Sequence, residues 1–106
     1  MQDEVKITKN GHSLIAALTC EIDHHIARRV REQIDRQVFA TRPELLVLDF
    51  SGVHFMDSSG IALIIGRVEV SRAVSATVRV TGLSPTLRRL VRLSGLEKIR
   101  ELVISA

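Results

Sequence analysis

A short apolar run constrains the fold of this chain most strongly. Residues 45–50 are apolar at every position except Asp49. A run of this kind is typical of a strand that is buried on both faces, as in parallel sheets flanked by helices. The sequence therefore predicts an α/β domain with a strand at this position.

The segments before this run predict a hairpin and a helix. Residues 5–7 alternate between apolar and polar, Asn10-Gly11 is typical of a tight turn, and residues 14–18 are apolar, so two antiparallel strands are expected. Asp23 is a good helix N-cap, and apolar residues follow it at intervals of four. The pattern predicts an amphipathic helix whose apolar face consists of Ile26, Val30, Ile34 and Val38.

The segments after the run predict further alternation of helices and strands. A helix over about 58–74 should lie deep in the domain, because its first turns are apolar nearly all round. Residues 77–80 are expected to form a strand, and Ser84 to cap a third helix that ends at Gly95. Residues 99–104 should form a last strand, or a shorter strand with a stub. We therefore expect a mixed sheet of about five strands, opened by the antiparallel hairpin and packed with three or four helices.

Length and composition fit one domain spanning residues 1–106. Hydrophobic residues make up 45% of the chain and charged residues 25%, which is typical of a globular protein. No apolar stretch reaches the roughly 18 residues that cross a bilayer, and the first residues lack a signal pattern, so we expect a cytoplasmic protein without membrane contact. The single cysteine, Cys20, is expected to be a small buried thiol.

The positive net charge of +3 raises the possibility of a nucleic-acid partner. The basic residues are nevertheless mixed with acidic ones along the predicted helices, as in residues 31–36. The chain has no block of Lys and Arg and no aromatic side chain between basic residues that could stack on a base. We therefore expect no direct nucleic-acid binding.

The loop after the central strand ends in the motif Asp57-Ser58-Ser59-Gly60. In a purely structural interpretation, Ser58 or Ser59 caps the next helix, Asp57 favours the positive end of its dipole and Gly60 allows tight packing. In a functional interpretation, one serine caps and the other stays exposed to receive a phosphoryl group. That group adds about −1.5 to −2 charges, which a helix N-terminus tolerates but a docking partner does not.

Catalytic alternatives have little support in the sequence. The motif lacks the first glycine of a nucleophile elbow, and no histidine can be assigned as a base beside Ser58, as a serine hydrolase would require. His24 and His25 are adjacent, so on a helix they point about 100° apart and should not chelate one metal ion. No glycine-rich phosphate loop is present. The sequence predicts a non-enzyme without metal or cofactor.

Several motifs together resemble the STAS domain family, and within it the sporulation type of anti-sigma factor antagonist. The resemblance covers almost the whole chain. It rests on Glu21-Ile22-Asp23-His24-His25, on Phe55-Met56-Asp57-Ser58-Ser59-Gly60 with Ile65-Gly66-Arg67, and on Leu83-Ser84-Pro85 and Leu93-Ser94-Gly95-Leu96 with Lys98-Ile99.

The resemblance implies a cycle of partner switching. The unphosphorylated antagonist binds an anti-sigma factor that is also an ATP-dependent serine kinase, and a sigma factor is released. The kinase phosphorylates Ser58, the phosphoprotein dissociates, and a metal-dependent serine phosphatase resets it. Asp23 is implied to lie beside the phosphoacceptor loop and to contribute to partner docking, and Asp57, Ser59 and Gly60 to shape that loop at the interface. A monomer is expected.

Two other functions remain open within the same family. A general-stress antagonist would use the same mechanism with another sigma factor, although the Asp-His-His sequence and the paired serines favour the sporulation type. A STAS subunit that regulates an ABC transporter ATPase would need no phosphorylation, and the intact Asp57-Ser58-Ser59 sequence argues against it.

Overall fold

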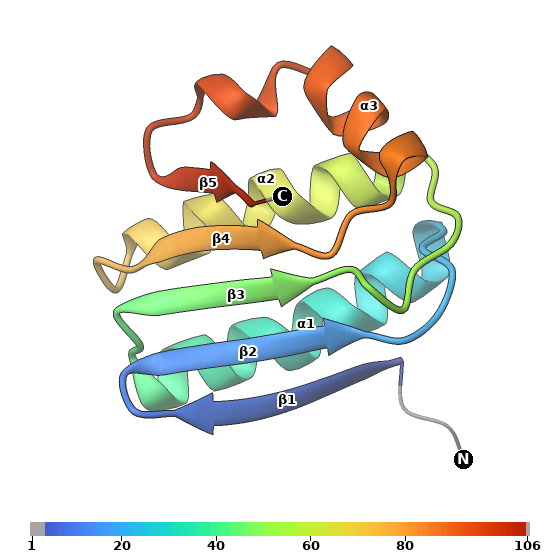
Figure 1. The fold of residues 1–106 in the computed structure, drawn as a ribbon. Helices are drawn as coiled ribbons and strands as arrows, with labels where there is room; N and C mark the ends of the chain where they lie inside the picture. Colours follow the sequence, from blue (N-terminus) through green and yellow to red (C-terminus); the bar gives the residue numbers. More distant parts are fainter. Residues whose placement is uncertain (1–3, 106) are drawn as a thin grey trace.

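The computed structural model describes residues 4–105 and contains a five-stranded sheet with three α-helices (Figure 1). In chain order the elements are β1 (Val5–Asn10), β2 (Ser13–Leu18), α1 (His24–Thr41), β3 (Leu45–Asp49), α2 (Ser58–Arg72), β4 (Thr77–Thr81), α3 (Pro85–Leu93), the short 3-10 helix η1 (Leu96–Lys98) and β5 (Leu102–Ile104). The expected domain bounds of 1–106 stay a prediction, because residues 1–3 and 106 lie outside the described part.

The sheet is mixed, as the sequence predicts. Its strand order is β1-β2-β3-β4-β5; β1 is antiparallel to β2, and every other neighbouring pair is parallel. Figure 1 shows α1 and α2 side by side behind the sheet. Because parallel strands in sequential order are joined by right-handed crossovers, the connecting helices fall on the same face.

This arrangement corrects one expectation about β3. Leu46 and Leu48 are completely buried under the helices, but Leu45, Val47 and Asp49 on the other face are only partly buried. The prediction that this strand is buried on both faces is therefore wrong. Neighbouring side chains of the sheet shield the second face, and no helix among the described residues covers it.

The ends of α1 and α3 follow the predicted capping residues. Asp23 Oδ1 accepts a hydrogen bond of 2.9 Å from the backbone N–H of Ile26, and Ser84 Oγ accepts one of 3.2 Å from that of Leu87. Gly95 follows α3 with a φ of 81°, in the left-handed region that favours glycine. These caps fix where each helix leaves the carboxyl edge of the sheet.

The α2 helix is less enclosed than its apolar sequence suggests. Leu63 and Ile64 are buried against the sheet, whereas Ala62 and Ile65 are exposed. The prediction of a helix wedged deep in the domain is therefore wrong, because the side of α2 that carries Ala62 and Ile65 is open to solvent. None of the helices in the described part of the chain is long and apolar enough to cross a membrane.

The Cys20 thiol is free and partly buried, not fully buried as expected. Burial, and then the nearby Glu4 carboxylate, raise the pKa of this thiol. A raised pKa lowers the fraction of reactive thiolate at neutral pH.

An ion pair joins α1 to α2 near the middle of both helices. Arg67 Nε lies 2.9 Å from Asp35 Oδ1, and the Arg67 side chain is only 3% exposed. Burial raises the pKa of Asp35 and lowers the pKa of Arg67, and the opposite charge of the partner counteracts each shift. A buried arginine of this kind depends on its carboxylate, because an unpaired charge in this position would be costly.

Candidate functional site

The loop that leaves β3 meets the segment that precedes α1. Ile22 and Met56 form an isolated parallel β-bridge. The N–H of Ile22 donates to the carbonyl oxygen of Phe55 at 3.1 Å, and the N–H of Asp57 donates to that of Ile22 at 3.3 Å. Asp23 and Asp57 each follow one partner of this bridge. Asp23 therefore lies beside the loop, and α1 and α2 begin next to each other.

The N-cap of α2 is Asp57. Its backbone is extended, with φ −97° and ψ −165°, and its Oδ1 accepts a hydrogen bond of 2.7 Å from the N–H of Ser59. The prediction that Ser58 or Ser59 caps this helix is therefore wrong. Aspartate and serine are about equally good N-caps, so the sequence could not select one of three consecutive candidates. With Asp57 as cap, both serines lie in the first turn.

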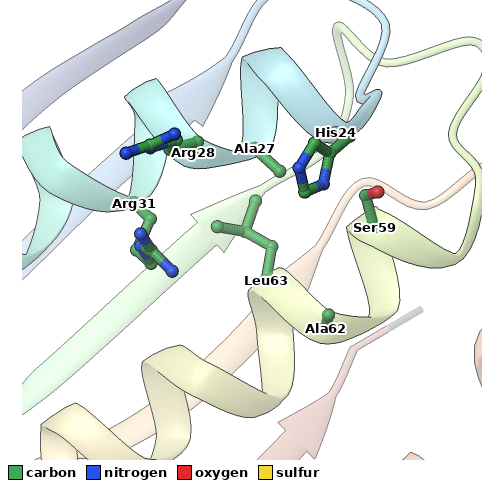
Figure 2. A pocket seen from close by; sticks show the side chains of 7 residues that line it. All are labelled: His24, Ala27, Arg28, Arg31, Ser59, Ala62 and Leu63. Carbon is green, nitrogen blue, oxygen red and sulfur yellow. The ribbon is translucent and has the colours of Figure 1, made fainter.

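The two serines have different surroundings. Ser58 is exposed, and its hydroxyl makes no hydrogen bond to another described residue. Ser59 is partly buried and lies across from His24 between the two helices (Figure 2). The hydroxyl of Ser58 is thus the accessible one, at the positive end of the α2 dipole.

Gly60 holds the first turn of α2 against the loop. It is buried, and a Cβ added there would overlap Sδ of Met56 and lie 3.1 Å from Cβ of the same residue. A larger residue would therefore require the side chain of the bridge residue Met56 to move. Gly60 therefore fixes the position of the neighbouring serines through packing.

A groove of about 340 Å³ separates the N-terminal halves of α1 and α2. Figure 2 shows Leu63 between the helices, with Arg31 extending from α1 toward α2. The lining residues are His24, Ala27, Arg28 and Arg31 from α1 and Ser59, Ala62 and Leu63 from α2. Sequence analysis did not predict this groove, although the spacing of three and four residues on each helix is the signal that such a shared face leaves.

The histidines form no evident catalytic or metal centre with the loop. The rings of His24 and His25 meet edge to face, with centroids 5.9 Å apart. Within residues 4–105, no three His, Cys, Asp or Glu side chains come together as metal ligands. His24 lies near Ser59 in the groove, and Ser58 has no histidine as a hydrogen-bond partner among the described residues.

Comparisons with known proteins place this geometry in a family. The STAS domain model matches residues 4–104. The anti-sigma F factor antagonist of Paenibacillus polymyxa is 33% identical over 99 residues, which cover 93% of this chain and 85% of the relative. The solved structure of the anti-sigma factor antagonist SpoIIAA in its unphosphorylated form superposes with a TM-score of 0.80 at 26% identity, covering 96% of this chain and 88% of that one.

A second solved structure shows the related protein after modification. The Bacillus cell fate determinant SpoIIAA in its phosphorylated form superposes with a TM-score of 0.72 at 26% identity, over 96% of this chain and 91% of that one. The fold described above therefore accompanies both states of that protein. Together, the family match over nearly the whole chain and these similarities show that this chain belongs to the STAS domain family.

Proposed function

We propose that this chain is an anti-sigma factor antagonist whose partner binding is switched off by phosphorylation of Ser58. The unmodified form binds an anti-sigma factor that is also an ATP-dependent serine kinase, so that a sigma factor is released. The chain acts in the cytoplasm as a regulator without catalytic activity of its own. The observation that carries this proposal is the exposed hydroxyl of Ser58 at the start of α2.

The position of Ser58 suits reversible phosphorylation. The serine needs no hydrogen bond of its own to hold the helix start, because Asp57 is the cap. A phosphate on Ser58 would lie at the positive end of the α2 dipole, where anions are stabilised. Modification can therefore proceed without unfolding α2, and a metal-dependent serine phosphatase can reverse it.

The surroundings of Ser58 suit a partner interface. Asp23 and Asp57 are exposed carboxylates at the two helix starts, and we assign both to partner docking. Ser59 and Gly60 set the shape of the same loop. In the complex with the kinase, Ser58 would face the bound nucleotide. A phosphoryl group on Ser58 would then be repelled by the negative charges of the nucleotide phosphates and would lose its hydration in the interface. Such charge repulsion and desolvation weaken binding.

Titration calorimetry with the cognate anti-sigma factor kinase tests the proposal. We expect the unmodified chain, taken as a monomer, to bind the kinase and Ser58→Ala to bind with similar affinity, since the alanine keeps the surface uncharged. Ser58→Asp should bind about 100-fold more weakly, or about 2.7 kcal/mol, because it adds a fixed negative charge. Equal affinity of the alanine and aspartate variants would contradict the switch, and no binding by the unmodified chain would contradict the function.

A further inference from the structure

The groove between α1 and α2 has a chemical character that the switch at Ser58 does not use. Its apolar lining residues are Ala27, Ala62 and Leu63. Its α1 wall carries Arg28 and Arg31, and no carboxylate is among its described lining residues. A groove of this kind matches an extended or helical segment with an aliphatic side chain and carboxylates.

The two arginines of the groove remain available for a partner. Arg28 is 4.0 Å from Glu32 on the same helix, with 72% of its side chain exposed, so this contact is weak. Arg31 is exposed; its charge acts on the Asp35 carboxylate of the same helix, but among the described residues it forms no ion pair within 4 Å. The neighbouring Arg29, in contrast, is held by both carboxylate oxygens of Glu4, at 2.5 and 3.2 Å. Positive charge is therefore left unpaired on the groove side of α1.

The groove is continuous with the proposed switch. Ser59 belongs to its lining, and Ser58 is the adjacent residue on α2. A phosphate on Ser58 would therefore add negative charge at the end of the groove that Ser59 lines. It would repel a carboxylate docked near the groove and would compete with it for the same positive charges.

We propose that this groove binds an acidic segment of the anti-sigma factor kinase. Carboxylates of that segment pair with Arg28 and Arg31, and an aliphatic side chain packs on Leu63. The inference rests on the proposed function and deepens it, because it assigns the partner chemistry that a phosphate on Ser58 would displace. The interface then has two parts: the exposed carboxylates at the helix starts and this basic groove.

Charge reversal on α1 tests the groove against a matched control. In calorimetry with the anti-sigma factor kinase, Arg31→Glu should bind about tenfold more weakly, because one attraction becomes a repulsion. Arg36→Glu makes the same change of charge on the same helix, but Arg36 lies on the side that faces β1. The affinity of this variant for the kinase should therefore equal that of the unmodified chain. Raising the salt concentration should weaken binding of the unmodified chain more than binding of Arg31→Glu.

A substitution on α2 tests the same groove from its other wall. Ala62 is exposed, and Ala62→Glu places a carboxylate where the partner's carboxylate would lie, so we again expect about tenfold weaker binding. Thermal unfolding of each variant checks that the fold is kept. The inference is wrong if Arg31→Glu and Ala62→Glu bind as tightly as the unmodified chain, or if Arg36→Glu loses as much affinity as they do. If the unmodified chain does not bind the kinase, the proposed function itself is contradicted and the inference with it.

Discussion

The starts of α1 and α2 have the same type of N-cap and differ in the residues directly after it. Each helix begins after a partner of the Ile22–Met56 bridge, and each has an aspartate as N-cap. The cap of α1 is followed by two histidines, and the cap of α2 by two serines. The aspartates thus cap both starts, and only the start of α2 presents hydroxyl groups.

The difference continues at the third helical residue. Ile26 in α1 is partly buried, whereas Gly60 in α2 is buried and packs without a side chain on Met56. The start of α2 therefore lies directly against Met56 in the loop after β3. The comparison teaches that an aspartate caps both helix starts, while the residues after the cap give only the start of α2 the hydroxyl group that we propose as the phosphoacceptor.

The largest effect on stability should come from the Arg67–Asp35 ion pair, which joins α1 and α2 beyond their first turns. Arg67→Met alone should lower the free energy of unfolding by about 3 kcal/mol, because Asp35 keeps a partly buried charge without its partner. The double variant with Asp35→Leu should recover most of this loss, since no unpaired charge remains. Urea unfolding measures both. If Arg67→Met alone were as stable as the unmodified chain, the ion pair would contribute nothing to holding the two helices together.

The next effect concerns the packing at Gly60. Gly60→Ala should destabilise the domain by about 2 kcal/mol, because the new Cβ would collide with Met56. Gly66→Ala is the matched control in the same helix: its Cβ meets nothing within 4 Å, and it should stabilise by about 0.5–1 kcal/mol. Thermal unfolding distinguishes the two. Similar gains from both substitutions would mean that the start of α2 is not tightly packed.

The two caps should contribute equally. Asp23→Ala and Asp57→Ala should each cost about 1 kcal/mol, because each leaves a backbone N–H of the first turn without its acceptor. Asp→Asn at either position should cost much less, since asparagine caps about as well. Chemical unfolding of the four variants provides the measurement. A large loss at one position and none at the other would break the likeness between the two helix starts.

The smallest effect should be that of Ser59. Because Asp57 is the cap, Ser59→Ala should change the free energy of unfolding by no more than about 0.5 kcal/mol, as for substitutions that remove no cap or core contact. The unfolding midpoint in urea measures it. A loss comparable with that of Asp57→Ala would mean that the serine hydroxyl also supports the helix start.

The sequence predicted a helix start correctly where only one residue could serve as the N-cap. Asp23 and Ser84 are single capping candidates ahead of clear apolar faces, and both helices begin as expected. At the start of α2, three adjacent residues could all cap, and the bridge to Ile22, a contact between distant parts of the chain, selects Asp57. The sequence carries no local signal for such a contact.

Two further features depend on how elements pack together. The apolar run in β3 predicted a strand correctly, but whether helices cover one face or two is decided by the crossovers, so the partial exposure of Val47 could not be anticipated. The groove between α1 and α2 depends on how these helices lie against each other. Its residues are ordinary surface and core side chains when each helix is considered separately.

The central claim is that Ser58, and not its neighbour Ser59, receives the phosphoryl group. The most direct measurement is mass spectrometry with peptide fragmentation after incubation with the cognate anti-sigma factor kinase and Mg-ATP. We expect one phosphoryl group on Ser58 in the unmodified chain and in Ser59→Ala, and none in Ser58→Ala. A phosphoryl group on Ser59, or none at all with a kinase shown to be active on another substrate, would contradict the account.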